Sequence, residues 1–536
     1  MIIFVADAFS DNYAGGAELT SDAIIEASLL PVNKVLSTKV NLQFMEKYQN
    51  CFWIFGNYSS VDQKCLLYAA KNLDYCIIEY DYKFCKYRSI KKHEHAEGKC
   101  DCHTKQNGKL VAAFMAKSKM NFWMSEQQKN IYQNYFPFIK NNTVLSSVFD
   151  QQALKSLKTL NTKDKNNKWL ILNSNSWIKG RDAAVKYAKE NNLDYELVWG
   201  LKHGELLKKL ASSKGLIFLP LAHDTCPRIV IEARALDCEL VTNSYVQHFE
   251  EDWFSSKSKI LSYLEKRAEY FWDVLHELIS EKLKIANKAT QSERSVKIVV
   301  PFYNASEWLS KCIDSIKKQK YKKFQCYFID DMSTDDSYAT AKAAIAGDKR
   351  FVLIKNKNKY YALENIVRAI NKANCNDEDV ILLLDGDDWL SSRYTLSTLL
   401  DYYEKDDCML TYGSYVYNPG GTRGVEPSRY PAEVVSANTY RDDMWRASHL
   451  RSFTYNLWKN LDHKDLKDKE GNYYKMAYDQ AIMLPLLEMA SERSKYIEET
   501  MYVYNKANPL NVDKIKAQQQ FDTAKEIRAK ERYKRI

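Results

Sequence analysis

Short apolar runs alternate with segments of helical period along almost the whole chain, and this alternation strongly constrains the fold. Strands that are separated by helices usually form parallel sheets covered by helices on their faces. The chain is therefore predicted to be an α/β protein. The predicted strands are IIFVAD (2–7), CFWIFG (51–56), YCIIEY (75–80), WLILN (169–173), YELVWG (195–200), LIFLPL (216–221), ELVTN (239–243), VKIVVPFYN (296–304), FQCYFID (324–330), FVLIKN (351–356) and VILLLD (380–385).

The length of 536 residues implies more than one domain, because a single hydrophobic core usually stops growing at about 250 to 300 residues. Two polar segments mark the predicted boundaries. NTKDKNNK (161–168) precedes a new strand, and ATQSERS (289–295) follows a charged amphipathic stretch at 257–288. We predict three domains, at residues 1–160, 161–290 and 291–536, with the linker helix in the second.

The charge balance favours a small anionic substrate. The formal net charge is +9, and acids are interspersed with bases, so nucleic acid is not required as a partner. One basic stretch stands out, at Lys525, Arg528, Lys530, Arg532, Lys534 and Arg535. It is interpreted as a solvated helix face, and docking on an anionic membrane surface is the alternative. Membrane contact is thus expected to be peripheral at most.

Targeting signals are weak in this sequence. No apolar run reaches the roughly 18 residues that a membrane-spanning helix needs. The N-terminus, MIIFVADAFSD, lacks a basic segment and becomes acidic at Asp7, so it predicts a first strand rather than a signal peptide. Twelve cysteines in such a chain are expected to be reduced thiols. We therefore expect a cytoplasmic protein without disulfides.

Three carboxylates follow the most apolar of these strands. VILLLD runs into Gly-Asp-Asp-Trp, which places Asp385, Asp387 and Asp388 together at the strand's end. Crowded like charges are costly unless a cation neutralises them. Mg²⁺ or Mn²⁺ meets this need, because it is typically held by one or two carboxylates plus phosphate oxygens. A metal-bound diphosphate is therefore predicted here.

Two further motifs precede the acids. VVPFYN leads from a strand into a helix, and FQCYFID ends in Asp330 and Asp331, followed by MSTDD. Ligands of parallel sheets bind at the carboxyl ends of strands, so these motifs are expected to line one crevice. Ser333 and Thr334 are alternatively interpreted as caps of the next helix.

In their order and spacing, VPFYN, IDDMSTDDS and DGDDWL resemble glycosyltransferase family 2, inverting enzymes of the GT-A fold, over about residues 294 to 510. The resemblance implies that Pro301, Tyr303 and Asp331 flank the base and ribose of a UDP- or GDP-sugar. It also implies that Asp385, Asp387 and Asp388 bind the ribose and the metal, Mn²⁺ or Mg²⁺. The acceptor would be a glycan or a glycoconjugate.

An inverting transfer also needs a general base for the acceptor hydroxyl. By the same resemblance, Asp479 in KMAYDQAIMLP is the matching residue, and an N-cap role is its alternative. His449 and Arg451 are interpreted either as contacts to phosphate or acceptor, or as surface-loop residues. Where many relatives have Ala-Arg-Asn, this chain reads NKYYALEN, so Lys359 is a candidate substitute for the arginine's charge.

The N-terminal half carries weaker motifs. Gly15 and Gly16 open a predicted helix, Lys179 and Arg181 stand at another helix start, and LPLAHDTCPRIVIEARA follows later. This order resembles glycosyltransferase family 4 of the GT-B fold, with its pair of Rossmann-type domains, over about residues 1 to 260. The resemblance implies that Gly16 and Glu18 line the cleft, Lys179 faces the donor diphosphate and Glu232 holds the donor ribose.

Departures from that pattern concern one loop. Asp224 stands where the family usually has Glu, and Cys226, Pro227 and Arg228 replace the typical Pro-Phe-Gly. This half is interpreted either as a second active transferase or as a degenerate binding scaffold.

One cysteine- and histidine-rich segment is explained by neither resemblance. It supplies Cys85, His93, His95, Cys100, Cys102 and His103. These residues offer suitable atoms for tetrahedral zinc, although the spacing is not that of a common zinc finger. A zinc site and a polar loop without metal both remain open.

Three functional interpretations follow. The first is a two-module glycosyltransferase, metal-dependent and inverting in its C-terminal domain. The second is a single active C-terminal transferase with an acceptor-binding N-terminal half. The third is a carbohydrate-binding protein without turnover, which the acid triplet disfavours because a pure binder does not need its electrostatic cost.

Overall fold

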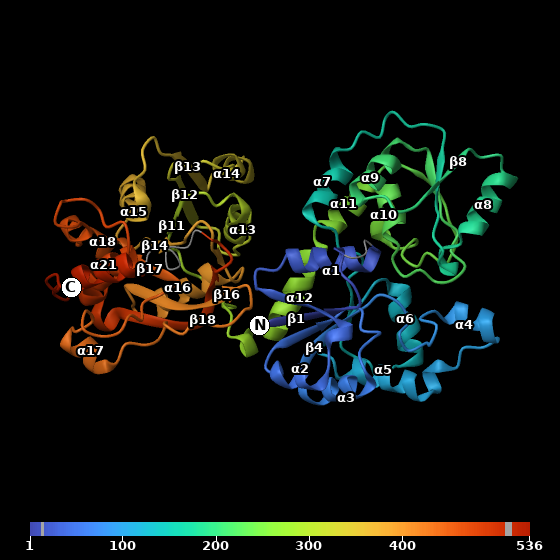
Figure 1. Ribbon diagram of the computed structural model, residues 1–536, viewed down its shortest axis with the longest axis horizontal. Helices are drawn as coiled ribbons and strands as arrows, with labels where there is room; N and C mark the ends of the chain where they lie inside the picture. Colours follow the sequence, from blue (N-terminus) through green and yellow to red (C-terminus); the bar gives the residue numbers. More distant parts are fainter. Residues whose placement is uncertain (12–14, 510–516) are drawn as a thin grey trace. The chain divides into compact units, whose positions relative to one another are not determined.

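The computed structural model describes residues 1–11, 15–509 and 517–536, which divide into two compact units. The N-terminal unit comprises Ile2–Ser28 and Val32–Leu278, and the C-terminal unit comprises Met1, Leu29–Pro31 and Ile279–Ile536. Both units pack helices around sheets that contain parallel strands, which confirms the predicted α/β class (Figure 1).

The first lobe of the N-terminal unit is a six-stranded parallel sheet in the order β2-β1-β3-β4-β5-β6. Its strands are β1 Ile2–Ala6, β2 Val32–Leu36, β3 Phe52–Phe55, β4 Asp74–Glu79, β5 Met120–Trp123 and β6 Asn142–Val144. Its helices are α1 Gly16–Glu26, α2 Leu42–Lys47, α3 Gln63–Asn72, α4 Ile90–Glu97, α5 Gln106–Lys117 and α6 Glu126–Tyr135. β1 and β3 are buried throughout, as expected for strands with helices on both faces.

The second lobe of this unit is a four-stranded parallel sheet in the order β10-β9-β7-β8. Its strands are β7 Trp169–Leu172, β8 Tyr195–Val198, β9 Gly215–Ile217 and β10 Glu239–Val241. The helices of this part of the chain are α7 Gln151–Thr159, α8 Arg181–Glu190, α9 His203–Ser212, α10 Arg228–Ala235, α11 Lys257–Leu264 and α12 Arg267–Leu283. α12 returns to the first lobe, where Trp272 Nε1 donates a hydrogen bond to the carbonyl of Ile24 (2.8 Å).

The C-terminal unit is built on an eight-stranded sheet in the order β13-β12-β11-β14-β17-β16-β18-β15. β13, β12, β11 and β14 are parallel neighbours, and β17 runs antiparallel to β14. The strands are β11 Val296–Phe302, β12 Phe324–Asp330, β13 Phe351–Lys355, β14 Val380–Leu383, β15 Trp389–Leu390, β16 Leu410–Asn418, β17 Arg451–Thr454 and β18 Ser494–Asn505. The helices are α13 Ser306–Lys317, α14 Ser337–Ile345, α15 Tyr361–Lys372, α16 Thr395–Lys405, α17 Ala432–Ala437, α18 Tyr455–Lys459, α19 Tyr478–Ala490 and α21 Ala517–Arg528.

Segments far from the main body of the C-terminal unit complete its fold. Trp389 Nε1 donates to the carbonyl of Leu29 (2.9 Å). Ser392 Oγ donates to the carbonyl of Ala286 (2.6 Å), and the amide of Ala286 donates to the carbonyl of Thr500 (3.3 Å). With Met1 and Leu29–Pro31 added to Ile279–Ile536, the unit is assembled from three separate pieces of the chain.

Each strand predicted from the sequence is present, but several end earlier than expected. β11 stops at Phe302, β14 at Leu383 and β9 at Ile217, because the residues that follow turn into loops at the carboxyl ends of the sheets. β2, β5, β6 and β15 to β18 were not predicted, since segments such as LTYGSYVYN and RSFT are not apolar runs. No helix among the described residues is long and apolar enough to cross a membrane.

The basic C-terminal segment agrees only in part with the predicted solvated helix face, because Lys525, Arg532, Lys534 and Arg535 are exposed but others bond to the unit. The guanidinium of Arg528 donates to the carbonyls of Arg441 and Asp443, and Lys530 Nζ donates to the carbonyl of Lys467 (2.7 Å). Arg532 forms an ion pair with Asp442. These basic side chains therefore hold the end of the chain against its own unit.

Candidate functional site

In the C-terminal unit, the strand order reverses between β11 and β14, because β12 and β13 follow on one side of β11 and β14 lies on the other. Ligands of open parallel sheets bind at the carboxyl ends of strands beside such a point. A cavity of about 440 Å³ lies at this position. It is lined by all the site residues predicted in this unit: Pro301, Tyr303, Asp331, Asp385, Asp387, Asp388 and Asp479.

The acid loop after β14 comes close to β11. The amide of Gly386 donates to the carbonyl of Pro301 (3.2 Å). A Cβ on Gly386 would lie 2.4 Å from Cβ of Phe302, so only glycine permits this approach. The loop thereby brings its three carboxylates to the cavity beside β11.

Mostly neutral donors hold the three carboxylates. Asp385 Oδ1 accepts a hydrogen bond from the hydroxyl of Tyr478 (2.6 Å). Asp388 accepts from the hydroxyl of Tyr502 (2.6 Å) and from the amide of Asn505 (2.7 Å). Asp387 Oδ2 accepts from the amide side chain of Asn508 (2.7 Å). These bonds fix the oxygens but leave most of the negative charge uncompensated.

Burial and crowding shift the protonation of two of these acids. Burial, followed by the charge of Asp385, raises the pKa of Asp387 to about 6. The pKa of Asp388 is raised well above its ordinary value by burial and by the charges of Asp387 and Asp385. A cation at this place would therefore stabilise the ionised loop.

One group of possible ligand atoms lies within this cavity. A carboxylate oxygen of Asp385, a carboxylate oxygen of Asp388 and a ring nitrogen of His449 all lie within 4.8 Å of one another. Carboxylates suit Mg²⁺ and Mn²⁺. Arg451 Nη2 lies 3.0 Å from Nδ1 of His449, and arginine only donates, so the neutral ring carries its proton on Nε2. Asp385 and Asp388 thus fit a hard divalent cation, whereas His449 is already held by Arg451.

Arg451 is the main positive charge beside the acids. Its side chain is 3% exposed on β17, and its guanidinium lies 3.7 Å from both Asp385 Oδ2 and Asp479 Oδ2. The surface-loop interpretation of Arg451 is therefore wrong. Burial and the nearby Arg451 hold the pKa of His449 well below its ordinary value, so this imidazole is neutral.

Asp479 lies in the first turn of α19, whose N-cap is Ala477. The alternative interpretation of Asp479 as an N-cap is therefore wrong. Its carboxylate is 24% exposed, lines the cavity and is oriented by Arg451. The position allows a proton to be taken from a group bound in the cavity.

The other end of the cavity carries an aromatic surface. Tyr303 is 39% exposed, and Lys359 Nζ lies 3.3 Å from the centroid of its ring. Asp331 is buried, and its carboxylate accepts from the amides of Tyr360 (2.8 Å) and Tyr361 (2.9 Å). Asp331 thus fixes the loop that carries Lys359 beside Tyr303.

Ser333 and Thr334 do not cap the helix that follows them. Ser333 Oγ accepts from the amide of Asn304 (3.0 Å), and Asp335 Oδ2 accepts from the amide of Ser306 (3.2 Å) at the start of α13. The turn after β12 thus folds back toward the end of β11, and Asp335 bonds to the starts of both α13 and α14, since its Oδ1 accepts from the amide of Ser337 (3.0 Å).

A larger hollow of about 920 Å³ lies at the opposite edge of the same sheet. Its lining includes Arg294 and Asp379, which precede β11 and β14, and Lys297, which lies at the start of β11. Arg294 is ion-paired with Glu378 and Glu404. Because this hollow lies at the amino ends of the strands and its charges neutralise one another, the acid-lined cavity is the better candidate site.

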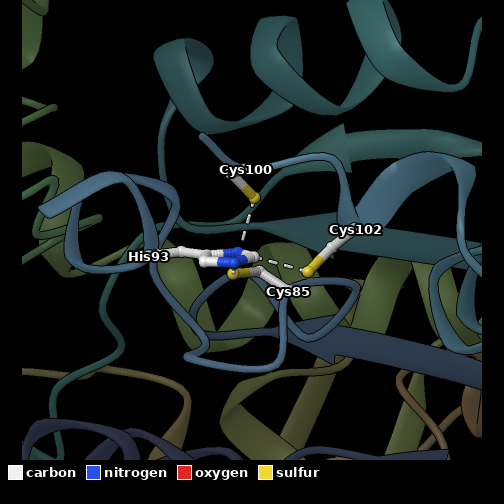
Figure 2. Close-up of side chains that lie close together, drawn as sticks. All are labelled: Cys85, His93, Cys100 and Cys102. Atoms are coloured by element: carbon white, nitrogen blue, oxygen red, sulfur yellow. Dashed lines mark hydrogen bonds between the residues drawn. The ribbon is translucent and has the colours of Figure 1, made fainter. Parts of the chain in front are cut away.

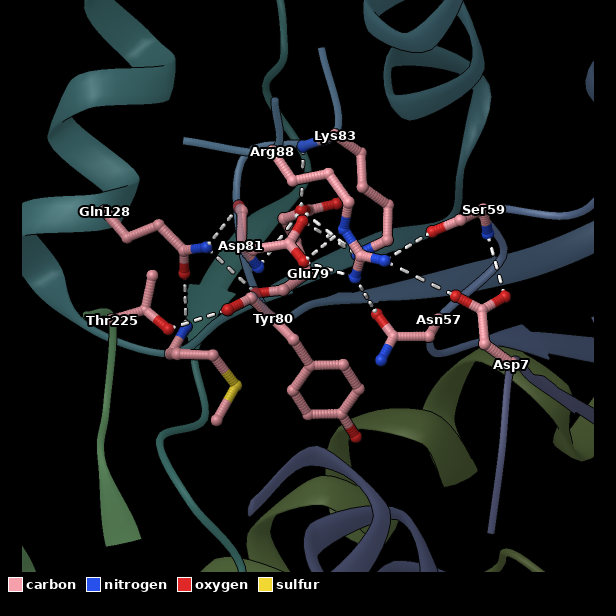
Figure 3. Close-up of polar contacts among 11 residues, drawn as sticks. Asp7, Asn57, Ser59, Glu79, Tyr80, Asp81, Lys83, Arg88, Gln128 and Thr225 are labelled. Atoms are coloured by element: carbon pink, nitrogen blue, oxygen red, sulfur yellow. Dashed lines mark hydrogen bonds and ion pairs between the residues drawn. The ribbon is translucent and has the colours of Figure 1, made fainter. Parts of the chain in front are cut away.

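The strand order also reverses in the N-terminal unit, between β1 and β3 and between β7 and β9, and a ligand crevice is expected at the carboxyl ends of the strands beside each such point. At the first, Arg88 reaches residues that follow three strands (Figure 3). Its guanidinium donates to Asp81, to Ser59 Oγ (2.7 Å) and to Asn57 Oδ1 (3.0 Å), and it lies 3.6 Å from Asp7 Oδ2. Sequence reasoning missed Arg88, which lies inside the cysteine- and histidine-rich segment and carries no motif of its own.

At the second crevice, Lys179 and Asp224 form an ion pair (Nζ–Oδ2 2.6 Å) from the loops after β7 and β9. Glu232 is 2% exposed, and its Oε1 lies 2.8 Å from Nε2 of His203 and 3.6 Å from Nε of Arg228. Burial alone would raise the pKa of Glu232, but His203 and Arg228 outweigh it and lower the pKa.

Gly16 lies in the neighbourhood of Glu232. A Cβ on Gly16 would lie 3.6 Å from Cδ of Arg228, the residue that also approaches Glu232. Residues 12–14 of the preceding loop lie outside the described residues. Gly16 and Glu232 therefore both approach Arg228, and Lys179 lies in the loop after β7, while their roles in donor binding stay predictions.

Comparison with known proteins bears on the C-terminal unit. Residues 297–465 match the family model described as Glycosyl transferase family 2. Glycosyltransferase GlyA of Streptococcus pneumoniae is 22% identical over 213 residues, which are 39% of this chain and 30% of GlyA. EpsJ of Bacillus subtilis, an uncharacterized glycosyltransferase, is 24% identical over 226 residues, which are 41% of this chain and 63% of EpsJ.

Among solved structures, S. aureus TarS 1–349 in complex with UDP-GlcNAc is similar at 15% identity and a TM-score of 0.35, over 44% of this chain and 65% of that one. The chain covers less than two thirds of the length of each of these three proteins. The family match and the glycosyltransferase relatives show that the C-terminal unit contains a glycosyltransferase domain of family 2.

Proposed function

We propose that the chain transfers a sugar from a UDP- or GDP-sugar to a hydroxyl of a glycan or glycoconjugate, with inversion and with a divalent cation in its C-terminal unit. The observation that carries this proposal is the acid loop after β14, where two carboxylates with raised pKa values open onto the 440 Å³ cavity. Asp385 and Asp388 would hold the ion, and Asp387 adds charge beside them. A bound Mn²⁺ or Mg²⁺ would supply positive charge to the diphosphate as it leaves.

The nucleotide end of the donor is assigned to the aromatic side of the cavity. The exposed ring of Tyr303 offers a stacking surface for a base, and Pro301 lies beside it in the same lining. Lys359 is drawn to this place by the ring of Tyr303. Its charge is proposed to face phosphate in the position where relatives carry an arginine.

Asp479 is proposed as the general base. Its partly exposed carboxylate lies in the same cavity as the acid loop, and Arg451 orients it by an ion pair. A base placed beyond the donor can deprotonate the acceptor hydroxyl as this attacks the anomeric carbon from the face opposite the diphosphate. Inversion follows from that placement.

Replacement of Asp479 tests this assignment. Asp479→Asn keeps the shape of the side chain but cannot accept the proton, so transfer should fall by about 10²- to 10⁴-fold. Donor affinity, measured by calorimetry with Mn²⁺ present, should stay within about twofold, because uniform binding is not removed. Normal transfer by Asp479→Asn would rule out this residue as the base.

For the N-terminal unit we propose a GT-B-like pair of Rossmann-type domains that binds a second nucleotide sugar. The arrangement supporting it is the pairing of Lys179 with Asp224 at the second crevice, together with Arg228 and Glu232. Basic side chains at helix starts suit a diphosphate without a metal ion. The three-domain division at residues 160 and 290 belongs to this proposal.

An acceptor-binding N-terminal unit is the second candidate, and full-length variants separate the two. A panel of nucleotide sugars is offered to the chain carrying Asp387→Ala and Asp388→Ala. Remaining donor turnover that disappears on adding Glu232→Gln supports two transferases. Complete loss of turnover by the double variant alone supports a single C-terminal transferase, and full activity of the double variant contradicts the C-terminal assignment.

A further inference from the structure

Four of the six side chains in the cysteine- and histidine-rich segment converge on one point. Cys85, His93, Cys100 and Cys102 each direct a sulfur or ring nitrogen into a common space, with all four atoms within 4.8 Å of one another (Figure 2). The residues come from the loop after β4, from α4, and from the connection between α4 and α5. Their side chains are between 1% and 7% exposed.

The printed distances agree with tetrahedral ligation. Zn–S bonds of about 2.3 Å and a Zn–N bond of about 2.0 Å place two sulfurs about 3.8 Å apart, and a sulfur and a nitrogen about 3.5 Å apart. Cys85 Sγ and Cys100 Sγ are separated by 3.7 Å. His93 Nδ1 lies 3.6 Å from Cys85 Sγ and 3.3 Å from Cys102 Sγ.

A carboxylate stands behind the histidine. Nε2 of His93 lies 3.1 Å from Oε2 of Glu97, one turn later on α4. This bond places the ring proton on Nε2 and leaves the lone pair of Nδ1 directed at the sulfurs, as in the carboxylate–histidine pairs behind many zinc ions. Glu97 is itself held by Lys86 (2.7 Å) and by the hydroxyl of Tyr87 (2.8 Å).

The two remaining histidines do not join the group. The ring of His95 stacks on Trp177, with centroids 5.0 Å apart, and the ring of His103 lies 4.6 Å from that of Tyr135. The fold therefore selects one histidine and three cysteines out of six candidates, which is a ligand set of structural zinc sites.

We propose that Cys85, His93, Cys100 and Cys102 bind one structural Zn²⁺ that closes the segment between β4 and α5. Three thiols release their protons to solvent on binding, and all four tetrahedral positions are taken by protein atoms. No position is left for a water or a substrate, so the site is structural rather than catalytic.

The place of the site in the fold indicates what the ion stabilises. Arg88 lies between Cys85 and His93 in the sequence and reaches Asp7, Asn57 and Asp81 at the first crevice. On the far side, a Cβ on Gly108 would lie 2.0 Å from the carbonyl oxygen of Cys102, so α5 packs tightly against this loop. The ion would thus hold the loop that carries Arg88 against α5.

Metal analysis of the full-length protein tests the proposal. The wild-type chain, purified from medium containing zinc and washed with a mild chelator, is expected to retain about one zinc per chain. His93→Ala and Cys100→Ser should retain less than about a tenth of that amount. His95→Ala and Cys65→Ala, which alter a neighbouring histidine and another buried thiol of the same lobe, should keep it.

A second measurement remains informative even if the ligand variants fail to fold. The wild-type chain reconstituted with Co²⁺ is expected to show thiolate-to-cobalt charge-transfer bands and the intense visible bands of tetrahedral cobalt. Asp387→Ala with Asp388→Ala should leave zinc content and these bands unchanged, which separates this site from the acid-lined cavity.

Three outcomes would overturn the proposal. One is a wild-type chain without zinc and without the cobalt bands. Another is full zinc content in His93→Ala and Cys100→Ser. The third is a disulfide between Cys85 and Cys100 in the purified protein, detected by mass spectrometry of non-reduced peptides.

Discussion

The carboxylates at the carboxyl ends of the strands have basic partners in the N-terminal unit and mostly neutral partners in the C-terminal unit. In the N-terminal unit, Asp81 is paired with Arg88, Asp224 with Lys179, and Glu232 with His203 and Arg228. In the C-terminal unit, the acids of the loop after β14 accept mainly from two tyrosine hydroxyls, one backbone amide and one asparagine side chain.

This difference teaches which group of carboxylates is suited to hold a metal ion. A carboxylate that is neutralised by a close arginine or lysine does not need a metal ion to balance its charge. A crowded group that is bonded to neutral donors keeps its charge and favours a mobile cation. On this criterion, the metal dependence that we propose is assigned to the C-terminal unit.

The largest expected effect is on the unneutralised acids. Asp387→Ala with Asp388→Ala should reduce metal-dependent transfer by at least about a thousand-fold, which corresponds to about 4 kcal/mol of lost transition-state stabilisation. Thermal unfolding should show that the fold is retained, because removing crowded charge lowers electrostatic cost. Initial rates with saturating Mn²⁺ measure the loss. A decrease of less than tenfold would contradict the assignment of the metal ion to these acids.

A paired acid of the same unit should behave differently. Glu488 is 0% exposed and forms a two-point ion pair with Arg441, at 2.6 and 2.9 Å. Glu488→Gln leaves the buried guanidinium uncompensated and should cost about 3 kcal/mol of unfolding free energy. Metal affinity of the folded protein, measured by Mn²⁺ titration, should stay unchanged. Loss of Mn²⁺ binding would contradict the distinction between this ion-paired acid and the acids proposed to bind the metal.

The pH dependence of stability should have opposite signs at His248 and at Asp387. Burial lowers the pKa of His248 in the N-terminal unit to about 3, below its unfolded value of about 6.5. Because the unfolded chain binds the proton more readily, the contribution of His248 to the free energy of unfolding is complete above pH 6.5 and is lost as the pH falls toward 3. Between pH 7 and pH 5 the loss should be about 2 kcal/mol. Asp387, with a raised pKa of about 6, contributes at acid pH and loses that contribution as the pH rises through 6.

Hydrogen exchange followed by mass spectrometry can resolve the two units in the presence of a chelator. His248→Phe should flatten the acid loss in the N-terminal unit, and Asp387→Asn should flatten the opposite slope in the C-terminal unit. Parallel loss of stability in both units on acidification, with neither variant changing the slope of stability against pH, would contradict the opposite signs predicted for His248 and Asp387.

The smallest expected effect concerns Lys179. Lys179→Gln removes the cation that neutralises Asp224 and is proposed to face a diphosphate, so affinity for a donor bound by the N-terminal unit should fall by about tenfold. Lys186→Gln, at an exposed position of α8, is the matched control. Nucleotide-sugar titrations of the full-length chain with disabled C-terminal acids measure the difference, and equal affinities would remove Lys179 from the proposed site.

Much of the C-terminal site could be predicted, because its motifs directly follow apolar strands. Parallel strands bring their carboxyl ends to one edge, so Pro301 and Asp385 had to become neighbours once both runs were recognised as strands. The partners of the acids could not be predicted in this way. Tyr502 lies more than a hundred residues after Asp388, on a tyrosine-rich strand whose period does not stand out from the sequence.

The role of Arg451 was hidden for a related reason. RSFT is too short and too polar to be read as a buried strand, yet β17 pairs with β14 and points Arg451 into the cavity. The fold there is determined by non-local pairing rather than by local propensity. Similarly, the sequence contains six possible zinc ligands. Only the three-dimensional structure distinguishes the four whose side chains converge from the two that lie elsewhere.

The contribution of Leu29–Pro31 to the C-terminal unit has a practical consequence for dissecting the protein. A truncation that begins after residue 290 removes the acceptor for the indole N–H of the buried Trp389 and the 285–288 segment that bonds to Thr500 and Ser392. Such a fragment would be expected to aggregate or lose activity for reasons unrelated to catalysis. Point substitutions in the intact polypeptide are therefore the sounder way to assign an activity to either half.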